Sequence, residues 1–198
     1  MPAIGTLFDL TGKTAIITGS TKGIGKAIAE QFAEHSARVV ISSRKPGPCE
    51  EVAAAINAKH KPGTAIAIPA NISSRDDLTR LVNETNASFG KIDIMVCNAA
   101  SNPYYGPMSG ITDEAFAKIL SNNIISNNTL ATLVAPQMAE RKDGAIIIIS
   151  SIGGLRASTV IGAYCVSKAA DVQLARNLAA ELGPSGIRVN CISPGLVK

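Results

Sequence analysis

Short apolar runs alternate with amphipathic segments along the whole chain. The first run, residues 13–18, is followed by a segment in which Ile24, Ile28 and Phe32 recur at helical spacing. Further apolar runs of strand length follow at residues 38–42, 64–69, 92–97, 145–150 and 187–192. Buried strands that alternate with helices predict right-handed crossovers and a parallel sheet.

The segments between these runs show helical periodicity. Besides the helix that begins near residue 24, helices are predicted at residues 50–59, 76–89, 112–138 and about 157–182. The motif Pro46-Gly47-Pro48 predicts a turn. Residues 121–128 contain four asparagines, which are mediocre helix formers, so at least one is expected to be buried and hydrogen-bonded. The pattern predicts one α/β domain over residues 1–198, a doubly wound parallel sheet with six strands.

Composition and charge exclude several classes of protein. The chain is 46% hydrophobic and 17% charged, which is typical of a globular domain rather than a disordered one. The net charge of +4 is mild and its basic residues are scattered without aromatic interleaving, so no nucleic-acid partner is expected. The apolar runs are far shorter than the roughly 20 residues that cross a bilayer, so no membrane partner is expected.

Cysteine and histidine spacing indicates neither disulfides nor a metal site. The four cysteines form no C-x-x-C pair, and the two histidines have no nearby ligand partner, so we expect no metal. No secretory signal is recognised at the N-terminus. Packed, reduced thiols predict a cytoplasmic location.

A glycine-rich turn joins the first predicted strand to the first helix. Its sequence is Gly19-Ser20-Thr21-Lys22-Gly23-Ile24-Gly25. Glycines at such a turn let main-chain N–H groups approach a phosphate at the positive end of a helix. The spacing G-x-x-x-G-x-G differs from the commoner dinucleotide motif, and the alternative is a tight turn that merely needs glycine.

The tip of the second predicted strand indicates which cofactor this turn binds. In a dinucleotide fold, an acid at this place accepts hydrogen bonds from the ribose of NAD, whereas an arginine accommodates the 2′-phosphate of NADP. The chain has Ser43 and Arg44 here, and Lys22 adds a second positive charge. These residues favour NADP(H); the alternative for Arg44 is an ordinary loop cation.

Tyr164 and Lys168 carry the candidate chemistry. Side chains four residues apart share one helix face, and an ammonium beside a phenol lowers the pKa of the phenol. Such a tyrosine can exchange a proton with a substrate oxygen. Ser151 follows the fifth apolar run and is positioned to offer a hydroxyl to the same oxygen. Taken alone, a Tyr/Lys pair at this spacing is usually a solvated helix face.

These motifs together resemble the short-chain dehydrogenase/reductase family. The resemblance covers essentially the whole chain and rests on motifs in family order and spacing: Thr18-Gly19-x-x-x-Gly23-Ile24-Gly25, Asn98-Ala99-Ala100, Asn123, Ser151, Tyr164-x-x-x-Lys168 and Pro194-Gly195. It implies a Rossmann fold and hydride transfer between NADP(H) and a small carbonyl or alcohol substrate. The family more often has Asn-Ala-Gly at residues 98–100 and aspartate at Asn71.

The resemblance also implies roles for individual residues. Tyr164 would be the general acid/base, and Ser151 would orient the substrate oxygen. Lys168 would lower the pKa of Tyr164 and hold the nicotinamide ribose, and Asn123 would hold a water that links Lys168 to solvent. The cofactor would contact Gly19 to Gly25 with its pyrophosphate, Asn71, Ile72, Asn98, Ala99 and Ala100 on its adenine side, and Pro194, Gly195 and Val197 beside its nicotinamide.

Within the family the chain resembles the NADP-dependent carbonyl/retinal reductase branch that includes dehydrogenase/reductase member 4. The substrate would be a ketone, an aldehyde or a 3-oxoacyl group, and a homotetramer or homodimer is expected. Family members usually continue past Pro194-Gly195 with a substrate loop and a seventh strand, so a seventh strand is expected beyond Lys198. If the chain instead ends at Lys198, the alternative function is an NADP-binding protein with weak or no turnover.

Overall fold

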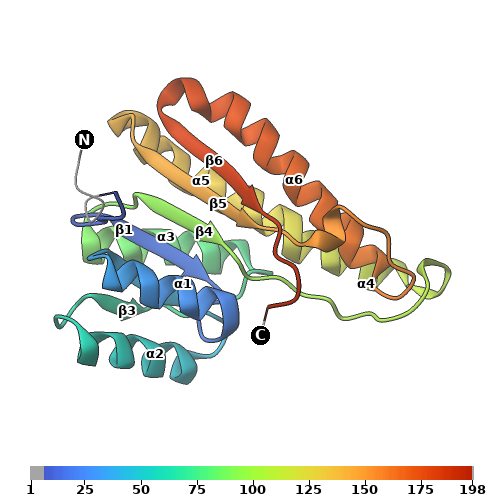
Figure 1. Cartoon of the computed structure of the whole chain (residues 1–198), viewed down its shortest axis with the longest axis horizontal. Helices are drawn as coiled ribbons and strands as arrows, with labels where there is room; N and C mark the ends of the chain where they lie inside the picture. Colours follow the sequence, from blue (N-terminus) through green and yellow to red (C-terminus); the bar gives the residue numbers. More distant parts are fainter. Residues whose placement is uncertain (1–6, 198) are drawn as a thin grey trace.

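Six parallel strands form one sheet in the computed structural model, which describes residues 7–197 (Figure 1). The strands are β1 (Thr14–Thr18), β2 (Arg38–Ser42), β3 (Ala65–Ala67), β4 (Ile94–Cys97), β5 (Gly144–Ile149) and β6 (Ile187–Ile192). Their order is β3-β2-β1-β4-β5-β6, the doubly wound order of a Rossmann fold. The predicted fold class is confirmed.

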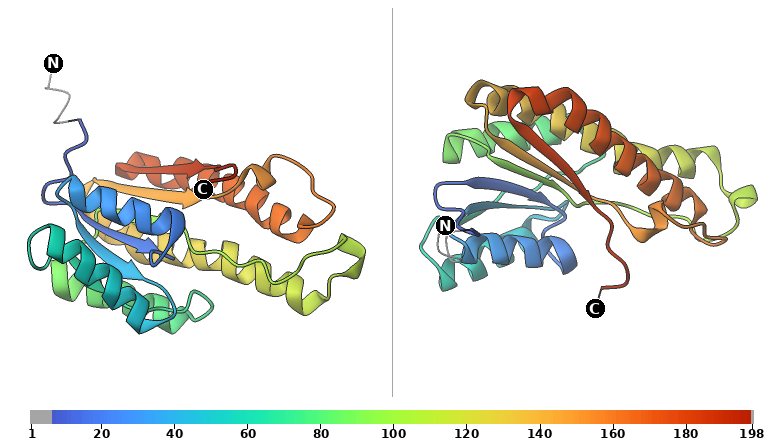
Figure 2. Two further views of the ribbon diagram at one scale, coloured as in Figure 1. Left: turned by 60° about the horizontal axis from the view of Figure 1, so that its bottom comes forward. Right: turned by 45° about the horizontal axis from the view of Figure 1, so that its top comes forward.

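Helices cover both faces of this sheet (Figures 1 and 2). They are α1 (Gly23–Glu34), α2 (Pro46–Lys59), α3 (Arg75–Phe89), α4 (Asp113–Leu120), α5 (Ser126–Arg141) and α6 (Gly162–Leu182). Shorter turns of helix lie at η2 (Met108–Gly110), η3 (Ser121–Ile125), η4 (Ile152–Gly154) and η5 (Gly183–Ser185). In the described part of the chain, no helix combines the length and apolarity needed to cross a membrane.

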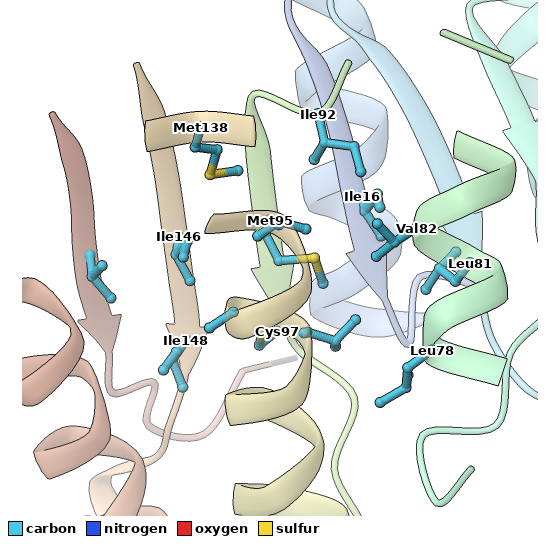
Figure 3. Close-up of a cluster of buried hydrophobic side chains, with 14 of the residues drawn as sticks. Ile16, Leu78, Leu81, Val82, Ile92, Met95, Cys97, Met138, Ile146 and Ile148 are labelled. Atoms are coloured by element: carbon cyan, nitrogen blue, oxygen red, sulfur yellow. The ribbon is translucent and has the colours of Figure 1, made fainter. Parts of the chain in front are cut away.

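In β1 to β5, alternate side chains enter two separate cores, whereas β6 buries only one face and exposes Arg188 and Asn190 on the other. On one face, Ile16, Met95 and Ile146 pack against α3, α5 and α6, as Figure 3 shows for Leu81 of α3 and Met138 of α5. On the other face, strand side chains pack against α1 and α2. Burial on both sides explains why β4 and β5 are continuous apolar runs, whereas β6, buried on one side, alternates apolar and polar residues over Ile187–Asn190.

Two helix starts differ from the prediction. α2 begins at Pro46, where a turn was predicted, because proline is tolerated in the first helical turn, whose N–H groups lack helical partners. α6 begins at Gly162 and not near residue 157. The Ser158 hydroxyl accepts hydrogen bonds from the main-chain N–H groups of Val160 and Ile161, and these bonds stabilise a turn.

The long helix predicted from residue 112 is divided by a turn of π-helix. α4 ends at Leu120, η3 is the π turn, and α5 continues to Arg141. The π turn lies within the asparagine-rich stretch. Such turns shift the main-chain hydrogen bonds by one residue and are frequent at functional sites.

Candidate functional site

A cleft of about 840 Å³ lies along the carboxyl ends of β1, β2 and β4. The strand order reverses between β1 and β4, which is where open α/β sheets bind ligands. The volume is that of a site for a cofactor-sized molecule. The cleft is lined by the glycine turn, the tip of β2, residues 70–73, residues 98–103, Lys118 and Asn122.

Glycine is required at three places in the turn between β1 and α1. Gly19 and Gly23 have φ values of +66° and +54°, which L side chains rarely adopt. A Cβ atom on Gly25 would collide with the carbonyl oxygen of Gly19 and lie 2.5 Å from Nδ2 of Asn98. The turn is thus a main-chain cradle, which fits a pyrophosphate at the N-terminus of α1.

Asn98 fastens the glycine turn to the end of β4. Its Nδ2 atom donates hydrogen bonds to the carbonyl oxygens of Thr18 at 2.8 Å and Gly19 at 3.2 Å. The hydroxyl of Thr18 accepts from the main-chain N–H groups of Asn98 and Ala99 at 3.0 and 3.1 Å. The motif at residues 98–100 therefore sets the shape of the cradle as well as lining it.

Most of the predicted cofactor residues line this cleft. They are Gly19, Thr21, Lys22, Gly23, Ile24, Gly25, Ser43, Arg44, Asn71, Ile72, Asn98, Ala99 and Ala100. Ser20 does not, because it is fully buried: its hydroxyl donates to the carbonyl oxygen of Ile17 and accepts from the N–H of Ser42. Ser20 instead holds β1 and β2 together at their tips.

The charged side chains around the cleft are all positive. Lys22, Arg44 and Lys118 line it, and within residues 7–197 no aspartate or glutamate does. Arg44 is exposed at the tip of β2 and forms no salt bridge to another described residue. The cleft therefore suits a polyanionic ligand.

Asn123 connects the cleft to helix α6, which carries the predicted catalytic residues Tyr164 and Lys168. Its Oδ1 accepts from the N–H of Ser101 at 2.8 Å, and its Nδ2 donates to the carbonyl oxygen of Ser101 at 3.1 Å and to the hydroxyl of Ser167 at 2.9 Å. Ser101 lines the cleft, and Ser167 precedes Lys168. The side chain is fully buried and bonded to protein groups at both ends.

Tyr164, Ser151 and Lys168 lie together beside the end of β5. Ser151 follows β5 at the start of η4, and its hydroxyl accepts from the N–H of Gly153 at 3.0 Å. Lys168 is 2% exposed, and its ammonium lies 5.6 Å from the ring centre of Tyr164. Tyr164 itself is half-buried. The three predicted catalytic side chains thus share one place.

The pKa of Tyr164 lies above its ordinary value, although the sequence predicted that Lys168 would lower it. Burial of the phenol is the largest cause, a hydrogen bond with Ser151 opposes it, and the charge of Asp171 raises the pKa further. The Lys168 ammonium donates to Asp171 at 2.8 Å and to the carbonyl oxygen of Ile149 at 2.7 Å. Its charge is therefore shared with a carboxylate.

The sequence did not single out Asp171, and it left Asn122 and Asn127 unexplained. Asn122 accepts from Ser73 at 2.7 Å and donates to Ser101 at 2.9 Å, tying the π turn to two cleft residues. The side-chain amide of Asn127 donates a hydrogen bond to Oδ1 of Asp171 at 2.9 Å. The sequence did contain one indication of the contact between Asp171 and Lys168: Asp171 follows Lys168 by three residues, so the two side chains lie on the same side of a helix.

The residues predicted beside the nicotinamide do not line the cleft, and two of them, Pro194 and Gly195, lie beside Ile152, which follows Ser151. The carbonyl oxygen of Pro194 accepts from the N–H of Ile152 at 2.9 Å, and Gly195 lies over the side chain of Ile152. Val197 is 66% exposed. No group of three or more His, Cys, Asp or Glu side chains suited to a metal ion occurs among the described residues.

Comparison with known proteins assigns the family. The family model described as short chain dehydrogenase matches residues 13–198. The chain belongs to the short-chain dehydrogenase/reductase family. It is 40% identical over 189 residues to dehydrogenase/reductase SDR family member 4 of Rattus norvegicus, an alignment that covers 96% of this chain and 67% of the relative. The same relative of Oryctolagus cuniculus is 41% identical, with 96% and 72% covered.

A solved structure confirms that this family's fold is present. The crystal structure of a short-chain type dehydrogenase/reductase from Mycobacterium marinum superimposes with a TM-score of 0.91 at 34% identity, covering 98% of this chain and 78% of that one. The resemblance to the branch of family member 4 is likewise confirmed by the relatives. The short-chain dehydrogenase therefore has an oxidoreductase role, and the cofactor class of its family is NAD(P)(H).

Proposed function

We propose that this short-chain dehydrogenase is an NADP(H)-dependent reductase of ketones, aldehydes or 3-oxoacyl groups. The observation that carries the proposal is the Ser151/Tyr164/Lys168 cluster, which Asn123 joins to a cleft whose charged residues are all positive. NADPH, when bound, supplies the hydride that reduces the carbonyl carbon. The residues of the chain bind the cofactor, orient the substrate and move the proton.

The cleft residues fit NADP(H). The glycine cradle and the N-terminus of α1 suit the pyrophosphate, since glycine at residue 25 lets the start of α1 pack closely against the carbonyl oxygen of Gly19 and so shapes the main-chain cradle. Arg44 and Lys22 suit a 2′-phosphate, and no described acid in the cleft is available to bind free ribose hydroxyls. These charges support NADP(H) over NAD(H).

The proton chemistry falls to Tyr164. Its raised pKa keeps the phenol protonated at neutral pH, so it can donate to the oxygen of a carbonyl that is gaining negative charge. In this proposal Ser151 hydrogen-bonds the same oxygen and so orients the substrate, and Lys168 holds the cofactor ribose. Asn123 stabilises the segment between cleft and helix α6, and its predicted water-holding role stays a prediction.

A kinetic panel tests the proposal. The protein is mixed with NADPH or NADH and a set of small dicarbonyls and aldehydes, and loss of reduced-nicotinamide absorbance is followed. We expect saturable turnover that is faster with NADPH. Tight NADPH binding without turnover on any member of the panel would favour the alternative, an NADP-binding protein with weak or no activity. A cytoplasmic homotetramer or homodimer remains our proposal for its state in the cell.

A further inference from the structure

A buried chain of hydrogen bonds runs from Lys168 to the π turn. The ammonium donates to Oδ2 of Asp171 at 2.8 Å, and Oδ1 of Asp171 accepts from Nδ2 of Asn127 at 2.9 Å. The same amide donates to the main-chain oxygen of Asn123 at 2.6 Å. The side chains of Asp171 and Asn127 thus connect the reacting lysine on α6 to the residue that holds the edge of the cleft.

The charges in this chain are almost inaccessible to water. Asp171 is 0% exposed, and Lys168 and Asn127 are each 2% exposed. Burial raises the pKa of the Asp171 carboxyl, and the Lys168 ammonium and the hydrogen bonds from Lys168 and Asn127 oppose that shift. Both carboxylate oxygens accept hydrogen bonds, which is the pattern of the ionised form. A buried ion pair gives little net stability, because desolvation costs about as much as the attraction gains. Stability alone is therefore a weak reason for a carboxylate at this place.

We propose that Asp171 is a positioning residue, which holds the Lys168 ammonium beside Tyr164 and balances its charge. This inference rests on the proposed function, since it gives Asp171 a part in the proton chemistry of Tyr164. Two hydrogen bonds, to Asp171 and to the carbonyl oxygen of Ile149, fix where the ammonium lies. Asn127 fixes the carboxylate in turn.

Charge balance decides when Tyr164 gives up its proton. An unpaired ammonium 5.6 Å from the ring would stabilise the phenolate and lower the pKa of Tyr164. The carboxylate of Asp171 opposes that effect, and the pKa of Tyr164 is raised by burial first and by Asp171 in addition. Pairing therefore limits how far the Lys168 ammonium can lower the pKa of Tyr164, and so sets how strong a general acid Tyr164 can be.

Four other titratable side chains lie around the Lys168–Asp171 pair and Tyr164. Cys97 of β4 and Cys191 of β6 face it, and burial raises the pKa of Cys97 to about 12 and that of Cys191 above its ordinary value. Cys165 of α6 and Tyr105 of the loop after β4 face Tyr164. The contacts from β5, η4 and α5 come from main-chain and uncharged polar groups.

The test is a titration of Tyr164 that needs no substrate. The chain has three tyrosines and no tryptophan, so phenolate absorbance can be read cleanly, and subtracting the Tyr164→Phe protein isolates Tyr164. Asp171→Asn keeps the shape of the side chain and removes its charge. Asp93→Asn is the matched control: Asp93 is 3% exposed and paired with Lys91 at 3.0 Å, but it precedes β4, at the opposite end of the sheet.

We expect Tyr164 of the unaltered protein to ionise above its ordinary value of about 10. In Asp171→Asn the midpoint should fall by about one pH unit or more, since the ammonium is then unbalanced. Asp93→Asn should titrate like the unaltered protein. An unchanged midpoint in folded Asp171→Asn, or ionisation of Tyr164 below its ordinary value in the unaltered protein, overturns the inference.

Two further measurements distinguish failure of this inference from misfolding of the variant and from failure of the proposed function. Circular dichroism shows whether Asp171→Asn folds; if it does not, Asp171→Ser is titrated, and the result for the unaltered protein still decides. Failure of the proposed function is a different outcome, because absent turnover with NADPH leaves the phenol titration readable. A lowered midpoint together with absent turnover would retain the Asp171–Tyr164 coupling and reject the reductase.

Discussion

The side-chain amide of Asn123 binds both main-chain polar groups of Ser101. It accepts from the N–H at 2.8 Å and donates to the carbonyl oxygen at 3.1 Å. The two residues belong to the π turn and to the segment that follows β4, so the bond pair ties the π turn to the lining of the cleft. Because Asn123 is 0% exposed, no solvent replaces these bonds if they are removed.

Asn123→Ala should therefore destabilise the protein by about 1–3 kcal/mol, the cost of leaving buried main-chain groups unpaired. Urea unfolding measures the change. Asn128→Ala is the control, because Asn128 is exposed in the same stretch and should have little effect. Equal stability of the two variants would contradict the structural role of the Asn123–Ser101 contact.

Tyr164→Phe should reduce turnover by roughly 10²–10⁴-fold, the usual contribution of a general acid. The affinity for NADPH, measured by fluorescence titration, should change little because the ring remains. Tyr105→Phe is the control: Tyr105 is 71% exposed in the loop after β4, and its activity should be close to that of the unaltered protein. If Tyr164→Phe retained its activity, Tyr164 could not be the general acid.

Arg44→Ala should weaken NADPH binding by about 30-fold, which corresponds to about 2 kcal/mol for a hydrogen bond to a charged group. NADH binding should be nearly unaffected, since NADH carries no 2′-phosphate. Lys45→Ala is the matched control, because Lys45 is the adjacent exposed cation and does not line the cleft. If both cofactors lose the same affinity, the NADP(H) assignment is wrong.

Gly25→Ala should abolish cofactor binding and lower stability by about 1–3 kcal/mol. The new methyl group would collide with the carbonyl oxygen of Gly19 and force the cradle open. Calorimetric titration with NADPH and thermal unfolding measure the two effects. Gly183→Ala, whose Cβ atom would meet nothing within 4 Å, should leave both unchanged. Normal binding by Gly25→Ala would exclude the turn as the pyrophosphate site.

The sequence alone determined the fold class, the family and most of the cleft. Strands that are buried on both faces can be predicted because they are uninterrupted apolar runs. The glycine turn can be predicted because no other residue tolerates its positive φ values and close main-chain contacts. The residues Gly19, Asn98 and Tyr164 are recognisable because each belongs to a motif that occurs in the order and at the spacing of the family. The starts of α2 at Pro46 and of α6 at Gly162 were harder to predict, because the start of a helix depends on a few local hydrogen bonds.

Tertiary structure decided how the reacting residues are coupled. Spacing placed Lys168 beside Tyr164, but it carried no information about Asn127, which comes from another helix and binds Asp171. Spacing also predicted a lowered pKa for Tyr164, whereas burial and the carboxylate raise it. Desolvation and charge balance depend on every group within a few ångströms. Those groups come from segments far apart in the chain, and only the folded structure brings them together.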